Sequence, residues 1–183
     1  MSLLTYNELV ALVDNGVIRG VPRENINGAS IDITLGKSVM VQAPSAGNNT
    51  VDLMAKEVPT MREIDLMATG YYDLAPYQFC LASTAEMFFL PNDIAAEYRL
   101  KSSLARAGLD AALAMWCDPG WHGSVLTLEF KNNLRGHNLR LRPGMKAGQM
   151  IFWRGQPVPD HASYAVTGQY NGDTSAQPAK GLR

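Results

Sequence analysis

Short runs of alternating apolar and polar residues make up most of this chain. The clearest run, Ser124–Phe130, has the period-two pattern of a half-buried strand. Its two faces are Leu126, Leu128 and Phe130 on one side and Val125, Thr127 and Glu129 on the other. Similar runs predict strands at 31–35, 39–41, 71–74, 78–82, 87–90, 139–142 and 149–153. Gly and Pro separate the runs, which favours a compact, mainly β architecture over alternating βα units.

Helical patterns are brief. Residues 5–8, Thr-Tyr-Asn-Glu, form a capping box before an apolar stripe, and Asn15-Gly16 ends this predicted N-terminal helix. Asn92 is placed to cap a short helix through Glu97. The segment 43–68 is polar and is expected to be irregular, and Gly36-Lys37 is expected to be a turn.

Composition indicates one domain with a tail. The 183 residues, 46% hydrophobic, suffice for one core. From Pro157 onward large apolar residues become rare. We therefore divide the chain into a domain, 1–156, and a flexible C-terminal tail, 157–183, that closes over the site in one interpretation and is disordered in the other.

Charge, hydropathy and cysteine content narrow the function. A net charge of −1 argues against nucleic-acid binding, which rests on many phosphate contacts. No apolar run reaches eighteen residues and no leader is recognisable, so we expect no membrane association. Two cysteines fit a reducing compartment, and we expect a cytoplasmic protein.

A candidate anion site begins at Lys101. Ser102 and Ser103 stand where a short helix can begin, Arg106 follows one turn later, and Gly108 is placed to end the helix. Hydroxyls, free N–H groups and two cations together suit a phosphate group. The alternative is an ordinary capped surface turn with two solvated cations.

Glu129 is the candidate for acid–base chemistry. A carboxylate on an apolar strand is either a solvated edge residue or a general base whose pKa is raised by partial desolvation. The pattern of residues leaves both interpretations open.

Zinc and serine chemistry lack their usual motifs. The zinc deaminases need His-x-Glu and Pro-Cys-x-x-Cys, and the chain has neither. Its histidines and cysteines lack ligand spacing; they are His122, His137, His161, Cys80 and Cys117. Ser102 and Ser103 lack a Gly-x-Ser-x-Gly elbow.

Several motifs in order resemble the dCTP deaminase branch of the dUTPase superfamily. They are Ile26–Asp32, Ser102–Leu109 (Ser-Ser-Leu-Ala-Arg-Ala-Gly-Leu), Asp118–Trp121 (Asp-Pro-Gly-Trp), Leu128–Phe130 (Leu-Glu-Phe), Pro143–Met145 and Gly148-Gln149. The combination is specific, and the resemblance extends roughly from Leu4 to Gly172. It implies a dUTPase-like (β-clip) distorted barrel of short strands with an N-terminal helix and short helical turns.

The resemblance also implies roles for particular residues. Glu129 serves as base and then as acid in a metal-independent deamination of dCTP to dUTP and ammonia. The other implied contacts are Ser102, Ser103, Lys101 and Arg106 around phosphate or the catalytic water, Asp118 and Trp121 at the sugar and base, and Tyr164, Gln169 and Tyr170 from the closing tail. It further implies a homotrimer with intersubunit sites, Mg²⁺ bound with the nucleotide triphosphate, and no zinc.

Departures from the family pattern keep other functions open. Lys101 stands where the family commonly has an arginine, and a lysine keeps the charge but lacks the bidentate geometry of a guanidinium. Gln169 and Asp173 stand where the family has Lys and Gln, and the connection from Gly108 to Asp118 is one residue short. The alternatives are a dUTPase or bifunctional dCTP-to-dUMP enzyme, in which an acid like Asp118 activates water, and a non-catalytic nucleotide-binding regulatory trimer. A modified cytosine nucleotide is a further alternative substrate.

Overall fold

Strands predominate in the computed structural model, which describes residues 2–44, 50–111 and 114–181. Its strands are β1 (Ser2–Leu3), β2 (Ile18–Arg19), β3 (Ile31–Gln42), β4 (Met61–Asp65), β5 (Tyr72–Leu74), β6 (Phe79–Phe89), β7 (Ile94–Leu100), β8 (Leu109–Ala111), β9 (Trp116–Cys117), β10 (His122–Asn132), β11 (Leu139–Leu141) and β12 (Lys146–Arg154). Its helices are α1 (Tyr6–Asp14), α2 (Leu66–Thr69), α3 (Ser102–Arg106) and α4 (Tyr164–Thr167), with 3₁₀ turns at Arg23–Asn25 and Asp160–Ala162. The predicted mainly β fold with brief helices is confirmed.

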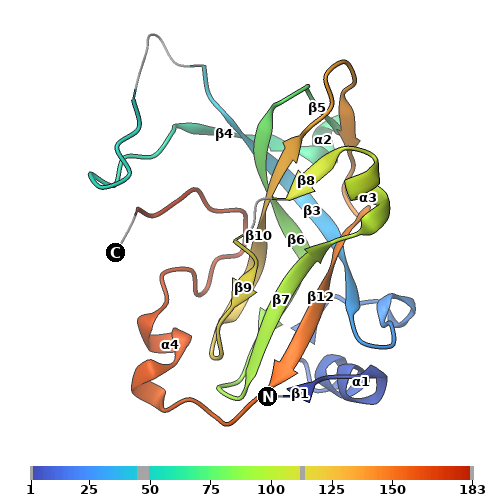
Figure 1. The fold of residues 1–183 in the computed structure, drawn as a ribbon, viewed down its shortest axis with the longest axis vertical. Helices are drawn as coiled ribbons and strands as arrows, with labels where there is room; N and C mark the ends of the chain where they lie inside the picture. The colour runs from blue at the N-terminus through green and yellow to red at the C-terminus, as the bar shows by residue number, and fades with distance from the viewer. Residues whose placement is uncertain (1, 45–49, 112–113, 182–183) are drawn as a thin grey trace.

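One curled antiparallel sheet organises the molecule (Figure 1). Its strand order is β8-β10-β6-β3-β12-β7-β9, while β1, β2 and β4 pair with β12, β6 and β3. A separate pair, β5 with β11, lies at one end, and α1 lies at the opposite end near β1 (Figure 1). Three fully buried phenylalanines, Phe88, Phe130 and Phe152, anchor the core from β6, β10 and β12. Each contributes on the order of 1.5–3 kcal/mol by leaving water.

Local signals correctly predicted two helices. The reciprocal bonds of the capping box between Thr5 and Glu8 start α1, and Gly16 follows its end with φ +71°. Gly108 follows α3 with φ +92°. Both ends use the positive φ that glycine adopts without a steric penalty.

The predicted helix from Asn92 to Glu97 is wrong. Ile94–Leu100 forms β7, which pairs with β12 on one side and β9 on the other. Two ladders of backbone hydrogen bonds and burial of Ile94, Ala96 and Tyr98 outweigh one local capping residue.

Pairing also joins segments that were predicted to be separate. Gly36-Lys37 is not a turn, because β3 runs unbroken through it. A Cβ at Gly36 would lie 2.6 Å from Ser83 Oγ, so glycine permits the close approach of β3 and β6. The strands predicted at 78–82 and 87–90 form one strand, β6. Strand β4 and α2 occupy part of the segment expected to be irregular, whose residues 45–49 lie outside the described ranges.

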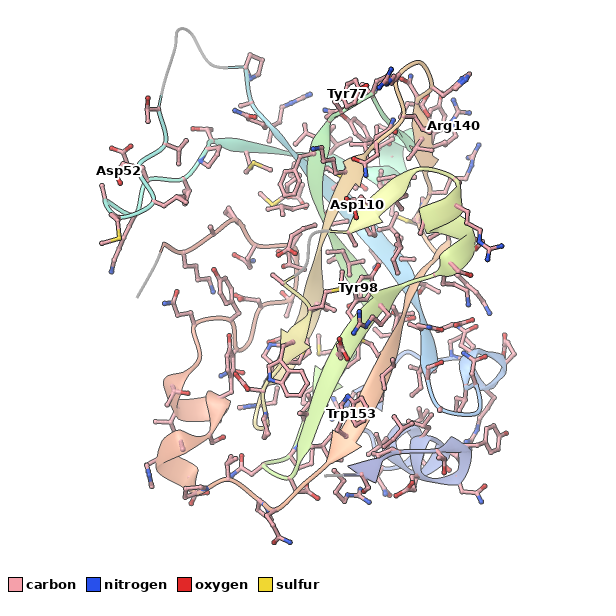
Figure 2. All side chains as sticks on the ribbon, viewed as in Figure 1. Asp52, Tyr77, Tyr98, Asp110, Arg140 and Trp153 are labelled. Atoms are coloured by element: carbon pink, nitrogen blue, oxygen red, sulfur yellow. The ribbon has the colours of Figure 1, made fainter. Side chains whose placement is uncertain are left out.

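Gly148 is required by a second close contact. A Cβ there would lie 2.1 Å from Cε2 of Tyr98, whose hydroxyl donates to the Ala147 carbonyl at 3.2 Å. Tyr98 projects from β7 beside β12 (Figure 2). Gly148 therefore allows β12 to pack closely against Tyr98 of β7.

Candidate active site

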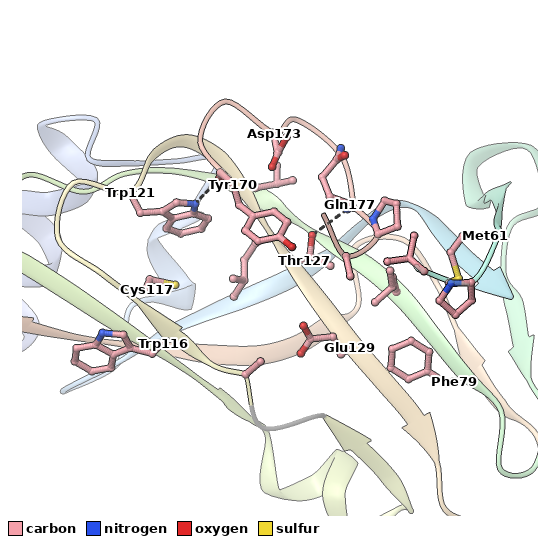
Figure 3. A pocket seen from close by; sticks show the side chains of 18 of the residues that line it. Met61, Phe79, Trp116, Cys117, Trp121, Thr127, Glu129, Tyr170, Asp173 and Gln177 are labelled. Carbon is pink, nitrogen blue, oxygen red and sulfur yellow. Dashed lines mark hydrogen bonds between the residues drawn. The ribbon is translucent and has the colours of Figure 1, made fainter. Parts of the chain in front are cut away.

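A cavity of about 560 Å³ lies between β10, β6, the turn after β9 and the C-terminal tail. Figure 3 shows Glu129 at its floor, with Trp116 on one side, Phe79 on the other and Tyr170 across from it. Of the candidate site residues, Glu129, Asp118, Trp121, Tyr164 and Tyr170 line this cavity. These five residues come from three segments of the chain, 118–121, 129 and 164–170, which only folding brings together.

Glu129 lies among apolar residues on β10, between Leu128 and Phe130 in the sequence. It is half-buried and lies directly opposite Leu81 of β6. No hydrogen bond to its carboxylate is formed within residues 2–44, 50–111 and 114–181. Burial raises the pKa of Glu129 to about 7. A carboxyl group with this pKa exchanges a proton readily near neutral pH, as a general base and acid must.

The predicted alternation of β10 fails at Leu126. The register of β10 against β6 shifts between Val125 and Thr127, and Leu126 lines the cavity instead of facing away from it. The Leu126 N–H, which the irregular pairing leaves free, donates to Thr84 Oγ1 at 3.0 Å. Because the shift precedes Thr127, the expected common face of Thr127 and Glu129 is retained.

Asp118 stands at the cavity wall in the turn after β9. Its carboxylate Oδ1 accepts a hydrogen bond of 2.8 Å from the indole Nε1 of Trp116. Trp116 is 52% exposed, although it lines the same cavity. Trp116 was not among the site residues predicted from the sequence, and its place in β9, two residues before Asp118, was the available signal. The indole holds the Asp118 carboxylate in one orientation.

Trp121 is buried, although it lies at the end of a turn. Its ring stacks on Phe88 with centroids 5.3 Å apart, and its Nε1 donates to the Tyr170 carbonyl at 2.9 Å. Gly120 before it has φ +88°, and a Cβ there would lie 2.0 Å from Ser163 Oγ. The turn is therefore packed closely against the tail.

The tail packs across the cavity through backbone and side-chain hydrogen bonds. Tyr170 O also accepts from Ser124 Oγ at 3.0 Å, and the Val125 N–H donates to Asp173 O at 2.9 Å. Farther along, the Gln177 N–H donates to Thr127 Oγ1 at 3.1 Å. Asp173 and Gln177 line the cavity. The sequence analysis noted Asp173 only as a departure from the family pattern and did not single out Gln177.

Lys180 supplies a cation that the sequence analysis did not single out. Its Nζ lies 2.8 Å from Asp173 Oδ2 and 2.9 Å from the Gln169 carbonyl oxygen. The same ammonium lies 4.8 Å from the centre of the Tyr170 ring. Gln169 itself does not line the cavity. The ammonium of Lys180 thus lies beside the backbone of Gln169.

The candidate phosphate residues lie elsewhere on the same chain. Lys101, Ser102, Ser103 and Arg106 do not line the cavity, and the two serines and the arginine are exposed on α3. Figure 1 shows α3 on the opposite side of the molecule from α4 and the tail. One chain therefore does not bring the two halves of the candidate site together.

A buried carboxylate orients the start of α3. Asp32 is 2% exposed and binds Lys101 Nζ at 2.7 Å, Lys146 Nζ at 2.8 Å and Asn27 Nδ2 at 3.0 Å. Desolvation opposes ionisation of Asp32, but these hydrogen bonds together outweigh it and lower its pKa. Lys101 is therefore already engaged by Asp32, and it positions α3 at the same time.

Metal-binding side chains do not gather in the described residues. Within residues 2–44, 50–111 and 114–181, no three His, Cys, Asp or Glu residues are close enough to share an ion. Cys80 and Cys117 are buried, and burial raises the pKa of each thiol to about 12. Both remain thiols at neutral pH.

No helix in the described ranges is both long and apolar enough to cross a bilayer.

Comparison with known proteins gives consistent matches over most of the chain. Residues 3–155 match the family model described as dCTP deaminase-like. The "dCTP deaminase, dUMP-forming" of Streptomyces coelicolor is 34% identical over 162 residues, which cover 87% of this chain and 83% of that protein. The protein of the same name from Thermobifida fusca is 32% identical over 183 residues, 97% of this chain and 92% of that protein.

A solved structure shares the fold. The crystal structure of 2′-deoxycytidine 5′-triphosphate deaminase from Agrobacterium tumefaciens superposes with a TM-score of 0.66 at 22% identity. The match covers 84% of this chain but 48% of that one, so this chain spans about half its length.

Proposed function

The chain belongs to the dCTP deaminase-like family, and on that premise we propose that it converts dCTP to dUMP in two hydrolytic steps at one site. The observation that carries the proposal is that two carboxylates suited to the two steps, Glu129 and Asp118, line one cavity. The similar proteins of S. coelicolor and T. fusca are both named as dUMP-forming, which favours the bifunctional reaction over release of dUTP.

Glu129 performs the deamination. Its carboxylate takes a proton from water, and the resulting hydroxide attacks C4 of the cytosine ring. The carboxyl group then gives its proton to the amino nitrogen, the proton of the new C4 hydroxyl passes to N3, and the amino group leaves as ammonia. Thus dCTP and water yield dUTP and ammonia. A pKa of about 7 suits both transfers, because the group must gain and lose one proton in each cycle.

Asp118 performs the phosphate cleavage. It activates a second water, which attacks the α-phosphorus of dUTP and releases diphosphate. The hydrogen bond from Trp116 holds the carboxylate in a fixed orientation at the cavity wall, as a general base requires. Mg²⁺ accompanies the triphosphate as part of the substrate, since Mg²⁺ is usually held by substrate phosphates and a few carboxylates.

The triphosphate is bound by α3 of a neighbouring chain. Ser102, Ser103 and Arg106 are exposed and do not line the cavity of their own chain. A homotrimer in which α3 of one chain faces the Glu129 cavity of the next gives each site both halves. In this arrangement Arg106 binds phosphate directly, whereas Lys101 acts mainly through Asp32.

Product analysis tests the proposal. The purified chain is incubated with dCTP and Mg²⁺, and the nucleotides are separated by chromatography over time. We expect dUMP and ammonia in equal amounts. Accumulation of dUTP without dUMP would leave deamination and remove the second step. Absence of any product, with nucleotide still bound, would favour the non-catalytic regulatory function.

A further inference from the structure

One side of the cavity beside Glu129 is formed by apolar side chains. This apolar corner consists of Val58, Pro59, Met61, Phe79 and Leu81. The sheet register places it next to the carboxylate, because Leu81 lies opposite Glu129 and Phe79 lies two pairs farther along, opposite Lys131. Opposite and diagonal pairs of this kind have side chains within reach of one another.

The corner is open to the cavity and is not filled by the fold. Phe79 is 41% exposed and Val58 is 37% exposed. Figure 3 shows Phe79 and Met61 on the side of Glu129 that is opposite Trp116. Gln42, the register partner of Met61, also lines the cavity. A small apolar group here would bury carbon surface that water now covers.

The polar residues lie toward the tail. Those lining this part of the cavity are Thr127, Tyr170, Asp173 and Gln177. A cytosine ring has the same division, since N3 and O2 occupy one edge beside C4 and the C5–C6 carbons occupy the other. With C4 at Glu129, the polar edge matches the tail side and C5 points into the apolar corner.

We infer that the cavity selects cytosine deoxynucleotides carrying a small alkyl group at C5, with 5-methyl-dCTP as the simplest member. The inference rests on the proposed deamination at Glu129 and specifies its substrate class. Burial of one methyl group favours the substituted nucleotide about fourfold, which corresponds to about 0.8 kcal/mol.

The chemistry at C4 is unchanged by the methyl group. Water adds at C4, Glu129 passes the proton to the amino nitrogen, and ammonia leaves. The 5-methyl-dCTP and water therefore yield thymidine triphosphate and ammonia, with no oxidant or reductant. Subsequent diphosphate release gives the thymidine monophosphate.

A competition experiment tests the substrate class. The full chain receives equal concentrations of dCTP and 5-methyl-dCTP in one reaction, and chromatography follows deoxyuridine and thymidine products separately. The ratio of their initial rates equals the ratio of the two kcat/KM values. We expect a ratio of about four in favour of 5-methyl-dCTP.

Two variants place the preference in the apolar corner. Met61→Gln keeps the length of the side chain and adds an amide, and Val58→Ser removes apolar surface from an exposed segment. Each should lower the ratio toward one, whatever its effect on the common rate. Met67→Gln is the matched control, because Met67 is 63% exposed on α2 and does not line this cavity. Its ratio should equal that of the parent.

Each outcome is decisive. Conversion of dCTP with a parental ratio of one or below overturns the inference and leaves the proposed deamination intact. A high parental ratio that persists in both corner variants overturns the assignment to the corner. Conversion of neither nucleotide overturns the proposed function, and the inference falls with it.

Discussion

Replacing Glu129 with glutamine is expected to abolish deamination and, at alkaline pH, to stabilise the protein. The amide keeps the shape of the carboxyl group but cannot accept a proton. We expect kcat to fall by about 10²–10⁴, the usual contribution of a general base. Nucleotide binding should remain near the parental level, because the amide removes no charge contact seen within the described residues.

The stability effect follows from the raised pKa. Desolvation moves the pKa of Glu129 from its ordinary value of 4.5 to about 7. Ionised Glu129 therefore destabilises the folded state by up to about 3 kcal/mol above pH 7. Because the side chain is partly exposed, solvent screening reduces this to about 1–3 kcal/mol. The penalty decreases as pH falls through 7 and is lost below 4.5, where the carboxyl group is protonated in both states.

Thermal unfolding at matched protein concentration measures the effect. Glu129→Gln should raise Tm at pH 8.5 by about 2–4 °C per kcal/mol and show a much smaller difference at pH 5. Glu63→Gln, on the exposed face of β4, is the control and should change neither activity nor this pH dependence. Equal or lower stability of Glu129→Gln at pH 8.5 would refute the burial argument. Retained turnover would refute the assignment of the base.

Three further perturbations test the surrounding structure. Asp32→Asn leaves Lys101 and Lys146 without their buried partner and should lower the free energy of unfolding by about 2–4 kcal/mol at pH 7, measured by urea unfolding. Because the pKa of Asp32 is lowered in the folded state, the difference between parent and variant should shrink as pH falls below the ordinary value of 3.8. A difference independent of pH would contradict the ion-pair account. Trp116→Phe removes the hydrogen-bond donor to Asp118 and should shift the product from dUMP toward dUTP. The rate of dCTP consumption should change by less than about threefold. An unchanged product ratio would mean that the hydrogen bond does not position Asp118. Glu129→Gln and Arg106→Ala chains should each be inactive, but co-refolding them in equal amounts should restore about one quarter of parental activity if each site takes one residue from each of two chains. No recovery, or a fully active monomer by light scattering, would contradict the shared site.

Local patterns were sufficient where one segment determines its own structure. The capping box at Thr5 starts α1 and Gly108 ends α3. Both signals could be read from the sequence because their hydrogen bonds and φ angles involve only neighbouring residues. Period-two alternation correctly put Thr127 and Glu129 on one face. The same local reasoning failed at Asn92–Glu97, where pairing with two distant strands determines the conformation.

Only the tertiary structure decided the environment of each candidate residue. The sequence left two interpretations of Glu129 open, a solvated edge residue or a general base. In the folded chain, burial against β6 and beneath the tail raises the pKa of Glu129. Pairing across 69 positions joined Lys101 to Asp32, and no sequence spacing indicates such a contact. Buried Glu86, whose carboxylate accepts three hydrogen bonds from Thr34, is equally invisible along the chain.

The sequence by itself therefore determined the class of fold, the two short helices and the types of side chain available for chemistry. Which of them meet depended on strand register and on the path of the tail. The shift at Leu126 and the contact of Lys180 with Asp173 show the reason. Both depend on atoms brought together from separate segments, and desolvation and hydrogen bonding act on those final distances, not on positions along the chain.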